Sequence, residues 1–206
     1  KGIPLIIDNT ASPVICKPLA HGAAIVMHSL TKYIGGHGTS IGGIVVDGGN
    51  FDWTKNRKRQ PLLNEPDQSY GGAVWIDAVP QLTGANIPFV IRLRVVLLRD
   101  TGAPLAPFNA WQIIQGLETV GLRMKQHCSN AEKVVTFLET QKKVQNVIYP
   151  TNHQGEIKER AKKYMQGGYG SLVGMDVGTK EAGAKFIDNL KMLYHVANIG
   201  DARSLA

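Results

Sequence analysis

One lysine lies where its side chain could do chemistry. Lys32 belongs to the segment HSLTKYIGGHGTSIGG, residues 28–43, behind a serine and a threonine and ahead of a run rich in glycine. A lysine in such a loop can be a surface charge, a clamp for a phosphate group or an amine nucleophile that forms a Schiff base. A Walker loop places its glycines before the lysine, and Gly36-His37-Gly38 lacks the third glycine of a dinucleotide-binding fingerprint. The hypothesis of an amine nucleophile remains beside that of a surface charge, and it can be checked because it requires particular neighbouring residues.

A Schiff-base lysine that carries pyridoxal phosphate needs particular neighbours. The phosphate requires hydroxyls and backbone N–H groups, and the pyridine nitrogen requires a carboxylate that keeps it protonated. Ser29 and Thr31 supply hydroxyls within three residues of Lys32, and Asp8 supplies a carboxylate 24 residues before it. Asp8 opens the sequence DNT, however, and could equally be a turn residue that bonds its own backbone. The residue pattern alone leaves both interpretations open.

Short apolar runs predict the elements that position these residues. Residues 3–7 and 23–27 suit buried strands of an α/β sheet, and Asp8 ends the first of them. Residues 41–46, rich in β-branched residues, give a third strand. Only thirteen residues, 28–40, separate the second and third strands, and their glycines argue against a packed crossover helix. We expect the third strand to return antiparallel to the second. Lys32 would then lie in a loop at a strand end, where the ligand groups of open α/β sheets collect.

The centre of the chain has a helical pattern. Apolar residues repeat at helical spacing between residues 111 and 138, and Asn109 is a candidate N-cap. Gly116 and Gly121 weaken the prediction of one continuous helix.

The remainder alternates strand and helix patterns. The sequences VQNVIYP and SLVGMDV predict strands around a basic helix near residues 156–165, and residues 181–194 predict another amphipathic helix. We expect a change of domain near residues 120–130.

Composition excludes several classes of protein. The 206 residues are 43% hydrophobic and 19% charged, which is typical of a globular chain. No apolar run is long enough to span a membrane, and the opening residues KGIPLIIDNT lack the layout of a signal peptide. These features favour a soluble cytoplasmic protein with no membrane partner.

Neither the net charge nor the cysteines indicate a further ligand. The net charge of +7 is densest at residues 55–59, but no helix-turn-helix or RNA-binding signature accompanies it, so we expect no nucleic-acid partner. Cys16 and Cys128 show no metal-ligand spacing, and we expect buried, inert thiols.

Longer motifs identify a family. The pattern D-N-T followed by H-S-x-T-K-Y-x-G-G-H resembles the cysteine/methionine-metabolism enzymes that use pyridoxal phosphate. Within that family, GGHGTSIGGIVVD followed by FDW is most similar to the sulfhydrylases that act on O-acetylhomoserine. The likeness continues through LLRDTGAPLAPFNAWQIIQGLETVGLRMKQHCSNA to HVANIGDARSLA, so it covers nearly the whole chain.

The resemblance implies a fold and an assembly. The fold is the aspartate-aminotransferase-like α/β fold, fold type I, with a mixed, mostly parallel sheet in a large cofactor-binding domain. Residues 1–125 would belong to that domain, and residues 126–206 to a smaller α+β C-terminal domain. The assembly would be a homotetramer, a dimer of dimers with shared active sites.

It also implies roles for single residues. Lys32 would be the Schiff-base lysine and proton shuttle, Asp8 the partner of the pyridine nitrogen, and Ser29 and Thr31 ligands of the cofactor phosphate. Asn198, in ANIGDARSL, matches a position near the amino-acid end of the substrate that is often serine in the lyases. Asn198 fits a turn or cap before a glycine equally well.

Two histidines flank the lysine loop. A structural, hydrogen-bonded role for His28 and His37 is favoured over a catalytic one, and their spacing is no metal motif.

The implied reaction is a γ-replacement. Lys32 would remove the Cα proton of O-acetyl-L-homoserine, acetate would leave from Cγ, and sulfide or a thiol would add to give L-homocysteine or a thioether. The preferred acyl donor, acetyl or succinyl, stays open.

The chain also departs from the family pattern. The segment DNTASPVICKPLAHG is one residue shorter than the usual DNTFATP-type segment, and family members are longer at both ends. Their additional parts would provide an aromatic residue stacked on the cofactor and an arginine that binds the substrate carboxylate. Arg203 matches a variable basic position, and we do not assign it that role.

Three hypotheses therefore stay open. The first is the γ-replacement enzyme. The second is a cystathionine γ-synthase or a methionine or cystathionine γ-lyase. The third is a non-catalytic protein that keeps the fold as a binding or assembly module.

Overall fold

The computed structural model describes residues 2–206, which form two compact units. Unit 1 contains the residues up to Asp8, Pro18–His28 and Ile44–Ala106. Unit 2 contains Asn9–Lys17, Ser29–Gly43 and Pro107–Ala206. Each unit is thus assembled from three separate stretches of the chain.

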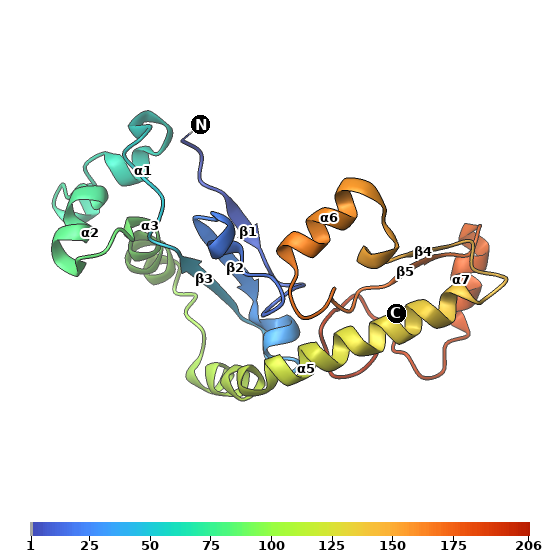
Figure 1. The fold of residues 1–206 in the computed structure, drawn as a ribbon. Coiled ribbons are helices and arrows are strands. Elements are labelled where there is room, and N and C mark those ends of the chain that lie inside the picture. The colour runs from blue at the N-terminus through green and yellow to red at the C-terminus, as the bar shows by residue number, and fades with distance from the viewer. Residues whose placement is uncertain (1) are drawn as a thin grey trace. The chain divides into compact units, whose positions relative to one another are not determined.

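A three-stranded sheet follows the order β1-β2-β3 (Figure 1). Its strands are β1 (Ile6–Asp8), β2 (Ile25–Ser29) and β3 (Gly43–Asp47). β1 and β2 run parallel, and their register places Asp8 opposite Met27. Asp8 therefore lies at the carboxyl end of β1, beside the carboxyl end of β2.

Two backbone hydrogen bonds show how β3 pairs with β2. The Gly48 N–H donates to the Ala24 carbonyl at 2.9 Å, and the Leu30 N–H donates to the Gly42 carbonyl at 2.8 Å. The earlier residue of β2's side, Ala24, pairs with the later residue Gly48, and the later residue Leu30 pairs with the earlier residue Gly42. The two strands therefore run antiparallel. The predicted antiparallel return is confirmed, and the sheet is mixed, as the fold class requires.

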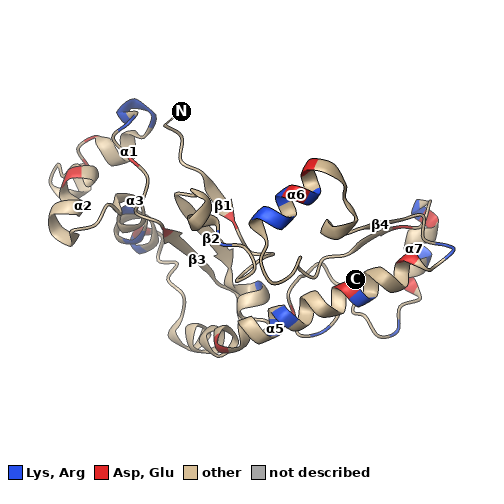
Figure 2. Cartoon of the chain, in the orientation of Figure 1, with Lys and Arg blue, Asp and Glu red and all other residues tan. Residues whose placement is uncertain are grey.

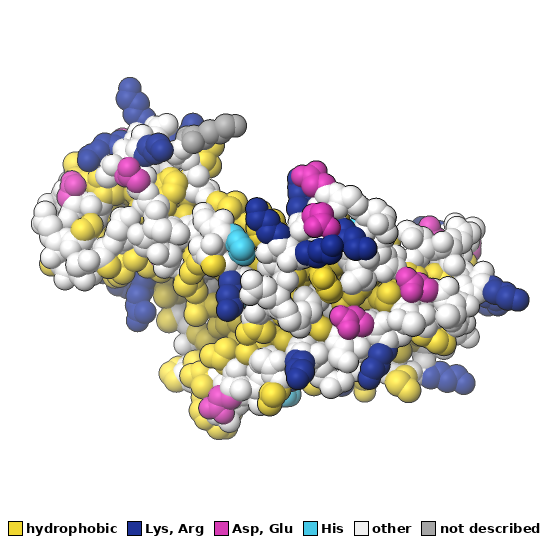
Figure 3. All heavy atoms as spheres, in the orientation of Figure 1, with side chains coloured by type: hydrophobic (Ala, Val, Ile, Leu, Met, Phe, Trp, Pro, Cys, Tyr) yellow, Lys and Arg dark blue, Asp and Glu magenta, His cyan; other side chains and the backbone are white. Residues whose placement is uncertain are grey.

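Burial of the strands differs from the sequence prediction. β2 buries Ile25 and Val26, but in β1 Ile6 is 49% exposed and in β3 Ile44 is 44% exposed. The expectation of a buried strand is confirmed for β2 and wrong for β1, and β3 is also partly exposed. These two strands form the edges of the sheet, and only β2 has a neighbouring strand on both sides. Hydrophobic side chains are accordingly visible at the surface in Figure 3.

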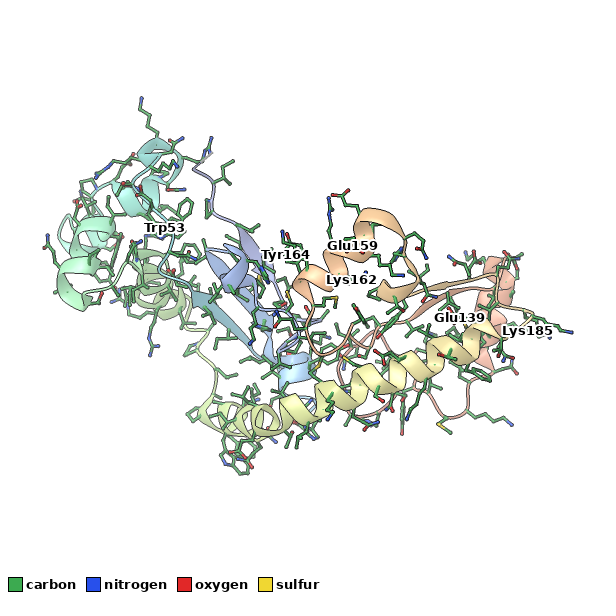
Figure 4. All side chains as sticks on the ribbon, in the orientation of Figure 1. Trp53, Glu139, Glu159, Lys162, Tyr164 and Lys185 are labelled. Atoms are coloured by element: carbon green, nitrogen blue, oxygen red, sulfur yellow. The ribbon has the colours of Figure 1, made fainter. Side chains whose placement is uncertain are left out.

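Unit 1 completes its core with short helices. They are α1 (Pro61–Asn64), α2 (Trp75–Thr83) and α3 (Pro88–Arg92), and α3 continues through Leu93–Leu98 into α4 (Arg99–Thr101). Trp53 is buried among their side chains (Figure 4) and stacks on Phe89 with ring centroids 5.4 Å apart. Stacked aromatic rings of this kind add to the stabilisation from burial.

Among residues 2–206 no single helix is long and apolar enough to cross a membrane. The helical segments Trp75–Thr83 and Pro88–Thr101 reach that length and apolar composition only when they are taken together, and the chain bends by 100° between them.

Helix α5 (Pro107–Glu139) is one continuous helix of 33 residues in unit 2. Its glycines each weaken a helix by only about 1 kcal/mol relative to alanine. Burial of one face, at Ile113, Val120 and Met124 among others, outweighs that loss. Asn109 lies inside the helix rather than at its N-cap, because Pro107 begins the first turn. Residue 125 also lies inside α5, and the domain division at this position stays a prediction.

The rest of unit 2 follows the predicted order. β4 (Asn146–Ile148) pairs antiparallel with β5 (Gly174–Asp176), α6 (Gly155–Tyr164) lies between them in the chain, and α7 (Lys180–Asp188) follows.

Helix α7 ends earlier than the predicted residue 194. The segment beyond it pairs instead with the last residues of the chain, where the Tyr194 N–H donates to the Ser204 carbonyl and the Ala206 N–H to the Tyr194 carbonyl. Tertiary pairing has overridden the local helical pattern.

Figure 2 shows charged residues in the segment before α1 and on helix α6, among other places. The basic residues 55–59 precede α1 and are exposed at Lys55, Arg57, Lys58 and Arg59. Helix α6 carries the ion pairs Glu156–Arg160 and Glu159–Lys162, and Figure 4 shows the second pair on one helix face. Exposed ion pairs of this kind contribute little to stability, because solvent screens them.

Candidate active site

Lys32 lies in a short helical turn, Leu30–Ile34, that connects β2 to β3. Its own backbone is not helical, with φ −89° and ψ −131° in the middle of the turn. The side chain is half-buried, and its Nζ donates to Oδ1 of Asn198 at 2.5 Å. The structure thus brings together two residues that the sequence prediction assigned to one site.

Backbone hydrogen bonds close the turn that carries the lysine. The Gly35 N–H donates to the Leu30 carbonyl at 2.9 Å, and the Gly36 N–H donates to the Lys32 carbonyl at 2.7 Å. Gly36 has φ +71°, in the left-handed region that favours glycine. The glycines after Lys32 therefore allow the chain to reverse within a few residues.

The two predicted phosphate ligands lie within the same connection. The Ser29 N–H donates to Oγ1 of Thr10 at 2.7 Å. Oγ1 of Thr31 accepts from the Gly42 N–H at 3.1 Å and lies 3.4 Å from the Gly42 carbonyl. Thr31 therefore helps to hold the β2–β3 return, and its hydroxyl keeps capacity for a further hydrogen bond.

The segment that carries Asn198 packs against the lysine turn. The Ala202 N–H donates to the Gly36 carbonyl at 2.8 Å. Gly200 has φ +76°, and a Cβ there would lie 2.5 Å from the backbone nitrogen of Tyr33. Only glycine fits this approach, so residues 198–202 and the lysine turn form one packed structure.

Asp201 strengthens this segment. Its side chain is buried and accepts from the Arg203 N–H at 2.9 Å. Burial acts to raise the pKa of Asp201, but the hydrogen bonds and charge of Arg203 outweigh it and hold the pKa below its usual range. Asp201 is thus an ionised anchor of the segment at neutral pH.

Asp8 and His28 belong to unit 1 and are described within it. Asp8 is exposed at the end of β1. Burial lowers the pKa of His28, while the charge of Asp8 acts in the opposite direction. Within the described residues, Nδ1 of His28 is buried without a hydrogen-bond partner.

His37 belongs to unit 2 and is exposed. Its Nδ1 lies 2.7 Å from the Gly35 carbonyl, a structural hydrogen bond of the kind expected for this residue.

Sequence analysis missed one residue that contacts the turn. Arg123, on α5, donates to the backbone carbonyls of Tyr33 and Ile34. The available signal was Gly116, since a glycine inside a strongly periodic helical pattern often marks a close approach of another backbone. We treated that glycine only as a helix-weakening residue.

Cys128 is buried, as expected, and Cys16 is half-buried. Within the described part of the chain, no three or more His, Cys, Asp or Glu residues gather in a way that could hold a metal ion.

The donor set of this turn fits pyridoxal phosphate. It offers a half-buried primary amine at Lys32, hydroxyls one and three residues before it, and a glycine-rich reversal directly after it. An amine can bind the cofactor aldehyde, and hydroxyls with backbone N–H groups suit a phosphate.

Comparison with known proteins supports this interpretation. An O-acetyl-L-homoserine sulfhydrylase of Leptospira meyeri is 48% identical over 211 residues, which cover 100% of this chain and 47% of the relative. A homocysteine synthase of Schizosaccharomyces pombe is 42% identical over 207 residues, which cover 99% of this chain and 47% of the relative. The chain thus spans about half the length of the curated relatives it matches.

Solved structures agree. An O-acetylhomoserine (thiol)-lyase of Campylobacter jejuni, whose crystal structure contains N′-pyridoxyl-lysine-5′-monophosphate, has a TM-score of 0.86 and 36% identity, covering 99% of this chain and 49% of that one. A cystathionine γ-lyase of Lactobacillus plantarum in complex with L-serine has a TM-score of 0.71 and 28% identity, covering 98% and 43%. The α/β fold class expected from the sequence is confirmed.

The sequence model described as Cys/Met metabolism PLP-dependent enzyme matches residues 1–206. The chain therefore belongs to this family of pyridoxal-phosphate-dependent enzymes.

Proposed function

We propose that this chain carries the Schiff-base lysine of an enzyme of methionine and cysteine biosynthesis. The enzyme would replace the acetyl ester of O-acetyl-L-homoserine by sulfide or a thiol, giving L-homocysteine, or a thioether, and acetate. The observation that carries the proposal is the hydrogen bond between Lys32 Nζ and Asn198 Oδ1, because it joins the amine and substrate-side motifs of the family in one site. The sulfhydrylase and homocysteine synthase relatives support the choice of reaction.

Four residues would hold the cofactor. Lys32 would bind its aldehyde carbon, Ser29 and Thr31 its phosphate, and Asp8 its pyridine nitrogen. Support for Asp8 comes from the register of β1 and β2, since its partner Met27 precedes Lys32 by only five residues. When bound, pyridoxal 5′-phosphate supplies an electron sink that stabilises negative charge at the substrate Cα and so permits acetate to leave from Cγ.

The proton transfers would belong to Lys32. Its Nζ, once free of the cofactor, would take the Cα proton of the substrate and return a proton at a later step. Oδ1 of Asn198 accepts a hydrogen bond from Nζ and so favours one position of the amine. Asn198 would also lie near the amino-acid end of the substrate.

The alternative activities are those of cystathionine γ-synthase and of methionine or cystathionine γ-lyase. They are less well supported, since the cystathionine γ-lyase structure is 28% identical with a TM-score of 0.71, against 36% and 0.86 for the O-acetylhomoserine (thiol)-lyase.

Two further statements belong to the same proposal. The enzyme would assemble as a homotetramer, a dimer of dimers, and would act in the cytoplasm. Analytical ultracentrifugation of the full-length protein would test the assembly.

The proposed activity is tested on the full-length protein. Borohydride reduction followed by peptide mapping should place a pyridoxyl group on Lys32, and O-acetyl-L-homoserine with sulfide should yield homocysteine and acetate. Release of ketobutyrate and ammonia without an added nucleophile would assign a γ-lyase instead. Absence of both the pyridoxyl group and any turnover would leave a non-catalytic binding or assembly module.

A further inference from the structure

The guanidinium of Arg123 contacts the backbone directly after the candidate catalytic lysine. Its Nη1 donates to the Tyr33 carbonyl at 2.6 Å, and its Nη2 donates to the Ile34 carbonyl at 3.0 Å. Tyr33 and Ile34 are the two residues that follow Lys32. One planar guanidinium therefore binds the second and third peptide groups after Lys32.

The same side chain is fixed to its own helix. Nη2 of Arg123 also donates to the Gly116 carbonyl at 2.7 Å, and Nε donates to Oγ1 of Thr119 at 3.1 Å. Four hydrogen bonds thus satisfy a half-buried cation, which would otherwise be unfavourable to desolvate. Because Nε and one N–H of Nη2 are bound to its own helix, Arg123 presents two of its three remaining N–H donors to the turn in one orientation.

Two glycines make this contact possible. A Cβ at Gly36 would lie 2.2 Å from Nη1 of Arg123, so the guanidinium occupies the space that a larger residue would fill. A Cβ at Gly116 would lie 2.2 Å from the Gly35 carbonyl oxygen, so helix α5 touches the turn at this point. Gly36, Gly116 and Arg123 therefore form one interlocked contact between the lysine turn and α5.

We infer that Arg123 is a positioning residue, which fixes the carbonyl groups of Tyr33 and Ile34 and thereby the direction of the lysine side chain that precedes them. The inference rests on the proposed function, in which Lys32 holds the cofactor and moves the substrate proton. Lys32 has a non-helical backbone conformation within a helical turn, so the direction of its side chain depends on how the residues that follow it are held. The Lys32 carbonyl itself is bound by the Gly36 N–H, so Arg123 supplies the contacts that the turn does not make internally.

The experiment compares three variants of the full-length protein. Arg123→Met removes all donors while retaining an unbranched stem. Arg123→Lys keeps the positive charge and the stem but replaces the planar fork by a single ammonium. Lys125→Met is the matched control, since Lys125 is an exposed cation on the same helix.

The first measurement is amide hydrogen exchange, with and without pyridoxal 5′-phosphate. Exchange at Gly35 and Gly36, whose N–H groups close the turn, should accelerate at least about tenfold in Arg123→Met. Arg123→Lys should show a smaller acceleration, and Lys125→Met should match the wild type. The exchange measured without cofactor depends only on the structure, so it remains decisive even where the proposed function fails the Lys32 mapping.

The second measurement is steady-state kinetics, together with the pH titration of the cofactor absorbance. Arg123→Met should lower kcat by about tenfold to a hundredfold with a small change in KM, because misplacing the lysine impairs the chemical step. The midpoint of the absorbance titration should shift in the same variant.

Wild-type exchange at Gly35 and Gly36 in a folded Arg123→Met protein would overturn the inference. If that variant does not fold, Arg123→Lys decides, and wild-type exchange, kcat and absorbance titration in it would overturn the inference equally. A wild-type protein without a pyridoxyl group on Lys32 would instead refute the proposed function.

Discussion

Lys32 donates a hydrogen bond from Nζ to Oδ1 of Asn198, although 166 positions separate the two residues in the chain. The contact exists because residues 198–202 pack against the turn after Lys32, where the Ala202 N–H binds the Gly36 carbonyl. The turn after β2 and residues 198–202 together form the candidate site.

Replacement of the lysine tests the centre of the proposal. Lys32→Ala should abolish turnover and the borohydride-trapped pyridoxyl adduct, because no other group of the turn offers a primary amine. Mass spectrometry of the reduced full-length protein and an assay for homocysteine give the two readouts. Lys17→Ala, at an exposed lysine, serves as the control. Homocysteine formation at the wild-type rate by Lys32→Ala would contradict the assignment.

Replacement of the amide tests the contact itself. Asn198→Leu preserves the approximate size of the side chain but removes the acceptor, and hydrogen bonds to charged groups contribute about 1.5 to 3 kcal/mol. We therefore expect kcat/KM to fall by at least about tenfold.

Asn198→Ser is the matched variant for that prediction. Its hydroxyl can still accept from Nζ, so its kcat/KM should lie between those of the wild type and Asn198→Leu. Equal kcat/KM values for all three proteins would show that the contact does not contribute.

Two glycines of helix α5 offer a matched pair for stability. A Cβ at Gly116 would lie 2.2 Å from the Gly35 carbonyl oxygen, whereas a Cβ at Gly121 meets nothing within 4 Å. Gly116→Ala should lower the free energy of unfolding by about 1 to 3 kcal/mol through overpacking. Gly121→Ala should raise it by up to about 1 kcal/mol, because alanine favours the helix. Denaturant unfolding of both variants measures the difference, and equal effects would argue against the close approach of α5 to the turn.

The half-buried His127 predicts a dependence of stability on pH. Burial lowers the pKa of His127, and the charge of Arg123 lowers it further. The unfolded chain therefore takes up a proton below pH about 6.5 that the folded state binds less readily. Stability should fall as the pH decreases from about 7.5 to about 5.

His127→Gln should make this slope shallower, and His195→Gln, at an exposed position, should leave it unchanged. Unfolding free energies of the three proteins at several pH values provide the measurement. An unchanged slope in His127→Gln would assign the pH dependence to other groups, among them His28, whose pKa burial also lowers.

Local patterns predicted most of the elements. The antiparallel return of β3 followed from the thirteen residues and the glycines between two apolar runs, because so short a connection cannot cross over a sheet. The limits of α5 and α7 could not be predicted in the same way. Packing of one face carries α5 past Gly116 and Gly121, and pairing of Tyr194 with Ser204 ends the helical region early.

The sequence by itself determined the chemistry that the chain can offer. Lys32, its neighbouring hydroxyls and the glycines after it are recognisable because residue type and spacing indicate an amine on a tight turn, whereas Asn198 is recognisable only through the resemblance to the family. Only the tertiary structure decided that Asn198 accepts a hydrogen bond from the Lys32 amine and that Arg123 donates hydrogen bonds to the turn after it. No local pattern encodes those contacts, because they depend on the close approach that Gly36, Gly116 and Gly200 permit between segments distant in the chain.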